Sequence, residues 1–105
     1  MTEARIVLTT ASSSEEARNI ARALVERRLA ACVNIVPGIE SVYRWQGKIE
    51  TAAEYLLVIK TQAAFFDGVR DAIGELHSYD LPECIMLEIT AGSEKYLSWI
   101  QENAG

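Results

Sequence analysis

The chain has 105 residues, of which 50% are hydrophobic and 24% are charged, as expected for one globular domain with a single core. Its formal net charge of −5 disfavours nucleic acid as a partner, because an acidic surface repels phosphate backbones. The longest apolar run is far shorter than the roughly 20 residues that span a bilayer, and the N-terminus lacks the features of an export signal. We therefore expect a cytoplasmic protein with no membrane partner.

The first half of the chain begins with a β-branched run, residues 5–10, that predicts a strand. Two overlapping capping boxes follow, Ser12 with Glu15 and Ser13 with Glu16, and they predict the start of a helix. Apolar residues at helical spacing then define one face of that helix: Ala17, Ile20, Ala21, Leu24, Val25 and Leu29.

Two long strand candidates, residues 32–45 and 48–61, flank Gln46-Gly47. This dipeptide suits a two-residue hairpin turn, since glycine adopts positive φ readily. Such a turn pairs Tyr43 with Glu50 and, if the register is unbroken, Val33 with Lys60. Pro37-Gly38 interrupts the first arm, and because proline donates no ladder hydrogen bond we expect a bulge there that shifts the register beyond it.

The second half carries an amphipathic helix at residues 63–76, a loop at 77–83, a strand at 84–90 and a short helix that opens at Gly92-Ser93. The resulting order, β-α-β-β-α-β-α, is typical of an α+β, ferredoxin-like split βαβ sandwich. We expect a single domain over residues 1–105, with an extended central β-hairpin and a C-terminal helix.

The length of the hairpin indicates an oligomer. About 14 residues an arm at about 3.3 Å each reach about 46 Å, whereas a chain of this size folds to a globule about 33 Å across. An exposed two-stranded ribbon with apolar side chains needs another surface, and a second copy of the chain is the simplest one. This argument leaves the number of copies open. The predicted interface residues are Ile39, Val42, Tyr43, Trp45, Ile49 and, on the last helix, Trp99.

Several short motifs follow one another along nearly the whole chain: residues 26–34 (ERRLAACVN), 37–38 (PG), 41–50 (SVYRWQGKIE), 57–61 (LVIKT), 77–83 (HSYDLPE) and 96–99 (YLSW). In this order they resemble the CutA divalent-cation-tolerance family. The family resemblance implies a ferredoxin-like subunit in a homotrimer whose hairpins pair between subunits, and reported binding of copper and similar metals. The trimer also resembles that of nitrogen-regulatory signalling proteins, which suggests small-ligand sensing in intersubunit clefts.

The chain departs from the family pattern at the positions associated with copper. The best-known bacterial members carry a cysteine at the end of the first strand, where this chain has Thr9 or Thr10, and a pair of histidines where it has Leu76-His77. Ser78 replaces the usual proline of the loop, which leaves the loop less rigid. Most of the copper ligand set is absent, which argues against tight copper binding.

His77 is the only histidine and the one candidate soft-metal ligand. Copper and zinc favour three or four nitrogen and sulfur donors, so a site would need other copies of the chain. The alternative is a loop histidine hydrogen-bonded to Glu83 or Asp80. The two cysteines lie in apolar runs without a neighbouring base, and we expect Cys32 and Cys84 to be reduced structural thiols.

Lys60 ends an apolar strand and therefore needs a partner. In one interpretation it projects into an intersubunit cleft beside Tyr79, His77 and Glu83 and binds an anion or carboxylate ligand. In the other it forms a structural ion pair with Glu83 or Glu50.

The leading hypothesis is a trimeric divalent-cation (copper) tolerance protein that binds metal weakly, through carboxylates, or acts indirectly. A small-ligand-sensing trimer and a structural docking scaffold are the alternatives, and an enzyme is least favoured, because one loop histidine and scattered carboxylates are the only acid-base groups. The candidate carboxylates are Glu50, Glu54, Asp80, Glu83 and Glu88.

Overall fold

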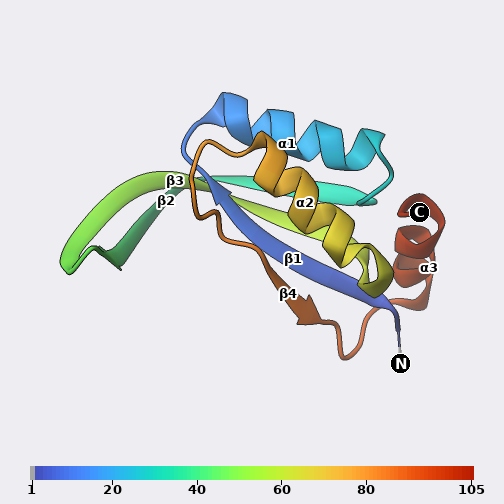
Figure 1. Ribbon diagram of the computed structural model, residues 1–105. Coiled ribbons are helices and arrows are strands. Elements are labelled where there is room, and N and C mark those ends of the chain that lie inside the picture. The colour runs from blue at the N-terminus through green and yellow to red at the C-terminus, as the bar shows by residue number, and fades with distance from the viewer. Residues whose placement is uncertain (1) are drawn as a thin grey trace.

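The computed structural model describes residues 2–105 and confirms the ferredoxin-like arrangement. Four strands form one antiparallel sheet in the order β2-β3-β1-β4, and α1 and α2 lie side by side on one of its faces (Figure 1). The elements are β1 (Ala4–Ala11), α1 (Ser14–Glu26), β2 (Cys32–Trp45), β3 (Lys48–Gln62), a 3-10 turn (Ala63–Phe65), α2 (Phe66–Leu76), β4 (Ile85–Glu88) and α3 (Glu94–Asn103).

The core lies between the sheet and helices α1 and α2. Alternate residues of each strand point to this side, as the two-residue period of a strand requires. The capping prediction holds for Ser13, whose hydroxyl accepts a hydrogen bond from the Glu16 amide at 3.1 Å. The fully buried members of this core include Val7, Ile20, Leu24, Leu57, Ile59, Val69 and Ile73.

The opposite face of the sheet stays largely uncovered in a single chain. Helix α3 packs at one end of this face, where Ile100 and Ala104 meet Ala4 and Ala31. The register places a second apolar set in the middle of the face, and two of its members, Ile85 and Leu87, are 49% and 44% exposed. This open face comprises Ile6, Leu8, Val36, Leu56, Val58, Ile85 and Leu87.

The hairpin is confirmed together with its turn and bulge. Gln46 and Gly47 both have positive φ, 50° and 80°, as the favoured two-residue hairpin turn requires. Tyr43 pairs with Glu50, and the register shifts between Val36 and Ile39. Beyond the shift the partner of Val33 is Ile59, so the unbroken pairing of Val33 with Lys60 does not occur and the expected displacement at Pro37-Gly38 does.

The tip of the hairpin projects past the helices, which gives the subunit dimensions of 44 × 26 × 23 Å (Figure 1). Val42 and Ile49, near the tip, are 63% and 62% exposed. Tyr43 and Trp45 are also exposed, while Ile39, at the base, is partly buried. The ribbon therefore presents apolar side chains that its own subunit does not shelter.

Two boundary predictions are wrong. Helix α1 ends at Glu26, so Leu29 lies beyond the helix, and Val25, inside its last turn, is exposed. The cause is Arg28, whose φ of 58° turns the chain so that the amide of Leu29 bonds to the Leu24 carbonyl, a Schellman-type ending. Strand β4 is also shorter than predicted and spans only Ile85–Glu88.

Candidate functional site

A cleft of about 610 Å³ lies between the hairpin and the loop at residues 77–83. Its lining combines three carboxylates with three aromatic side chains, and it includes neither lysine nor arginine. The hairpin provides Tyr43, Trp45 and Glu54, and the loop provides Tyr79, Asp80 and Glu83.

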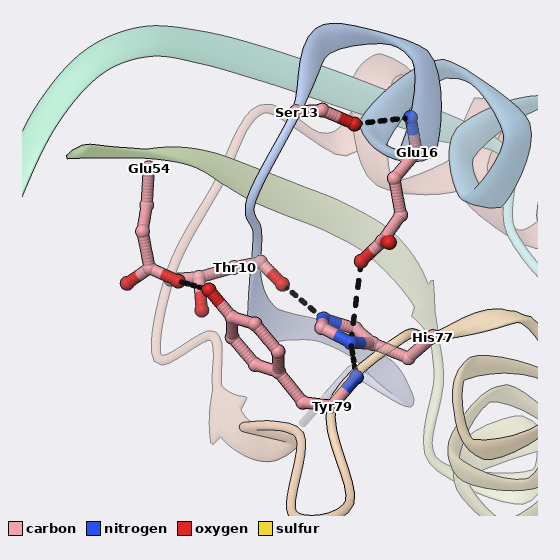
Figure 2. Close-up of polar contacts among 6 residues, drawn as sticks. All are labelled: Thr10, Ser13, Glu16, Glu54, His77 and Tyr79. Atoms are coloured by element: carbon pink, nitrogen blue, oxygen red, sulfur yellow. Dashed lines mark hydrogen bonds and ion pairs between the residues drawn. The ribbon is translucent and has the colours of Figure 1, made fainter. Parts of the chain in front are cut away.

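Glu54 is the most deeply buried acid of the cleft, with 6% of its surface exposed. It lies on β3 opposite Ile39, immediately beyond the register shift. The hydroxyl of Tyr79 donates a hydrogen bond of 2.8 Å to its Oε2 atom (Figure 2). No group in residues 2–105 donates to the other oxygen, Oε1, which Figure 2 shows turned away from Tyr79. Oε1 therefore remains open to solvent, while Oε2 is held by Tyr79.

The environment of Tyr79 changes the pKa of its hydroxyl group. Burial, together with the hydrogen bond to Glu54 and the charge of Glu54, raises the pKa of Tyr79 to about 12. The phenol therefore stays protonated at physiological pH and acts as a hydrogen-bond donor to the carboxylate.

His77 holds the loop from behind the cleft, and its side chain is fully buried. Its Nε2 lies 2.6 Å from the carbonyl oxygen of Thr10, which can only accept, so Nε2 carries a proton. Its Nδ1 accepts from the Tyr79 amide at 3.0 Å and lies 3.2 Å from Oε1 of Glu16, as Figure 2 shows. The rings of His77 and Tyr79 are tilted against each other, with centroids 4.7 Å apart. His77 thus positions Tyr79.

The partners of His77 differ from those expected. The nearby carboxylate belongs to Glu16 at the start of α1, and not to Glu83 or Asp80, because the end of β1 and the first turn of α1 pack against the loop. Both ring nitrogens already have protein partners, so a metal ion would have to displace one of them.

Lys60 lies outside the cleft lining. It is six positions along β3 from Glu54, a separation of about 20 Å at about 3.3 Å per residue, and its ammonium contacts the side-chain oxygen of Asn34 on β2. Neither Glu83 nor Glu50 forms an ion pair with it in the part of the chain that the structure describes. Glu50 is exposed near the hairpin tip and does not line the cleft.

The remaining candidates are scattered. No three His, Cys, Asp or Glu side chains among residues 2–105 are grouped so that they could hold a metal ion. Cys32 and Cys84 are free and partly buried, and burial raises the pKa of the Cys84 thiol. Trp99 stacks on Tyr96 in α3, with ring centroids 5.6 Å apart, away from the cleft lining.

Sequence reasoning missed the central position of Glu54, which it treated as one of five equivalent carboxylates. The available signal was a charged residue directly before the apolar run of β3, on the hairpin arm opposite the Pro37-Gly38 interruption. The contact between Glu16 and His77 had no local signal.

The site defines a class of protein: a ferredoxin-like subunit with a projecting ribbon and an acidic, aromatic cleft between the ribbon and the loop at residues 77–83. The family model described as CutA1 divalent ion tolerance protein matches residues 5–103. The chain therefore belongs to the CutA1 family.

Relatives of known name support this assignment. The divalent-cation tolerance protein CutA of Thermus thermophilus is 50% identical over 100 residues, which cover 95% of this chain and 97% of that protein. The chloroplastic CutA of Arabidopsis thaliana is 45% identical over 98 residues, and the match covers 93% of this chain and 54% of that longer protein. The crystal structure of CutA from Xylella fastidiosa matches with a TM-score of 0.96 at 40% identity, covering 99% of this chain and 100% of that one.

The names of the relatives mention tolerance of divalent cations and no reaction. They also differ in compartment, since one relative is called chloroplastic and a structure from Archaeoglobus fulgidus is called periplasmic. Across residues 2–105 of this chain, no helix combines the length and the apolar character needed to cross a membrane.

Proposed function

We propose that this chain serves divalent-cation tolerance as a homotrimer that works by binding and not by catalysis. The observation that carries the proposal is the apolar surface that one subunit leaves open, on the projecting ribbon and on the middle of the sheet. Exposed apolar surface on this scale is typical of an interface, and copies of the same chain are its simplest cover. The free thiols Cys32 and Cys84 support a reducing, cytoplasmic compartment.

The metal relation we propose is weak or indirect. Three of the five candidate carboxylates, Glu54, Asp80 and Glu83, line the same cleft, and oxygen ligands suit hard cations better than copper. His77 does not add a soft donor, since Thr10, Tyr79 and Glu16 surround its ring nitrogens.

Calorimetric titration with copper and zinc tests this part of the proposal. We expect no tight stoichiometric site in the wild-type protein and the same weak response in His77→Ala. A tight copper site that His77→Ala removes would refute it, and tight binding by the wild-type protein alone would already contradict it, even if the variant does not fold.

A second candidate function is the sensing of a small ligand in the cleft. The observation in its favour is the Oε1 atom of Glu54, an acceptor that has no donor among residues 2–105 and keeps contact with solvent, in a residue that lines a cleft of about 610 Å³. Clefts of roughly 300–1,000 Å³ with apolar walls and a few polar groups are typical of small-molecule sites. A ligand that binds the folded trimer would raise its apparent stability in a thermal-shift screen.

A further inference from the structure

We propose that the cleft binds an organic cation with N–H donors, a primary amine or a guanidine joined to a flat apolar group, with Glu54 as its counter-ion. This inference rests on the ligand-binding function proposed for the cleft, and it assigns the ligand a charge and a shape. It replaces the anionic ligand that the position of Lys60 in the sequence had suggested.

The charge of the lining selects a cation. Glu54, Asp80 and Glu83 contribute three carboxylates, and no lysine or arginine among residues 2–105 lines the cleft to offset them. The whole chain, these three carboxylates included, has a net charge of −5. Walls of one sign concentrate ligands of the opposite sign and repel those of the same sign.

Glu54 indicates that the cation carries N–H groups. The side chain of Glu54 is 6% exposed, and its Oε1 atom, which keeps contact with solvent, is the oxygen that a ligand in the cleft can reach. Tyr79 supplies one donor, at Oε2, and the protein supplies none at Oε1 within the described residues. An ammonium or guanidinium group at Oε1 completes the set, with a charge-assisted hydrogen bond that a quaternary ammonium cannot make.

The aromatic side chains of the cleft favour a ligand whose apolar part is flat. Tyr43 and Trp45, predicted from the sequence as interface residues, are two residues apart on β2, so their side chains share one face of the strand. In this proposal that face lines the cleft, and Ile49, on the other face of the ribbon, remains available to a second copy. Aromatic faces attract cations and stack on flat groups. A bare metal ion would leave most of a cleft of about 610 Å³ unfilled and would find no preformed group of three ligands among residues 2–105.

Intrinsic fluorescence provides the test. The chain has two tryptophans, so Trp99→Phe leaves Trp45, in the cleft wall, as the only reporter. The assembled protein in this background is titrated with three probes of similar size: phenethylamine, phenethyl alcohol and hydrocinnamate. We expect a saturable change with the amine, at least tenfold weaker binding of the alcohol, and no binding of the anion.

Two matched variants locate the charge. Glu54→Gln keeps the shape and one acceptor but removes the charge, and we expect it to weaken amine binding at least tenfold. Glu40→Gln makes the same change at an exposed position on the other face of the same hairpin, outside the lining, and we expect it to leave amine binding unchanged. If Glu54→Gln does not fold, the selectivity of the Trp99→Phe protein among the three probes decides the question.

Equal binding of amine and alcohol, or equal amine binding by the two variants, would overturn the cationic ligand and leave small-ligand binding in the cleft intact. No saturable change with any probe would overturn both the cationic ligand and the small-ligand candidate. The divalent-cation proposal has its own test in the calorimetric titration.

Discussion

The hydrogen bond between Tyr79 and Glu54 should contribute measurably to stability, and Tyr79→Phe is the change that removes it alone. Glu54 is 6% exposed, and the Tyr79 hydroxyl, at 2.8 Å, is its only protein donor among residues 2–105. Loss of the hydroxyl leaves a buried carboxylate without a donor. A buried charged group that loses its partner costs about 1–3 kcal/mol, so we expect Tyr79→Phe to lower the free energy of unfolding by that amount.

The assay is urea unfolding at one fixed protein concentration, because the stability of an oligomer depends on concentration. Repeating Tyr79→Phe in a Glu54→Gln background closes a double-mutant cycle, and the cost should fall to about 0.5 kcal/mol once no buried charge is left unpaired. Tyr43→Phe is the control, since the Tyr43 hydroxyl makes no hydrogen bond with residues 2–105. If Tyr79→Phe costs the same in both backgrounds, or no more than Tyr43→Phe, the hydrogen bond does not hold the carboxylate as described.

Three further outcomes follow from the geometry. Gly47→Ala should lower the free energy of unfolding by about 1–2 kcal/mol, because φ is 80° at this position and the open space around it leaves backbone strain as the only effect. Gly74→Ala, at an equally open but helical position, should raise the free energy of unfolding by about 0.5 kcal/mol, and equal effects of the two changes in urea unfolding would contradict the turn geometry. The stabilising effect of the raised pKa of Tyr79 is fully present below pH 10 and is lost as the pH rises towards about 12. The urea midpoint should therefore fall across this pH range, and the fall should be smaller in Tyr79→Phe. An identical pH profile for the variant would show that Tyr79 is not the group that titrates. His77→Ala leaves the Tyr79 amide and the Thr10 carbonyl without their partner, so it should lower the free energy of unfolding in urea by more than about 1 kcal/mol. An unchanged urea midpoint would show that the loop does not depend on the imidazole ring of His77.

Most of the hairpin could be predicted because its determinants are local. Gln46-Gly47 sets the turn, and Pro37-Gly38 sets the register shift, since each acts through the φ or the missing amide of its own residues. The end of α1 could not be predicted in this way. It depends on a left-handed arginine, Arg28, whose side chain carries no signal for that conformation.

The site could be predicted only in part. The loop motif identified Tyr79 and Glu83, which line the cleft together. Lys60 was expected beside them, but its strand position takes it about 20 Å from Glu54, and its ammonium contacts Asn34. The contact between His77 and Glu16 joins residues 61 positions apart in the chain, so only the packing of α1 against the loop reveals it.

The mass of the assembled protein tests the central claim most directly, because the proposed homotrimer rests on the open sheet face and the unsheltered ribbon. Sedimentation equilibrium of the purified chain at micromolar concentration should give three times the mass of one chain. A stable, well-folded monomer under those conditions would contradict the proposal.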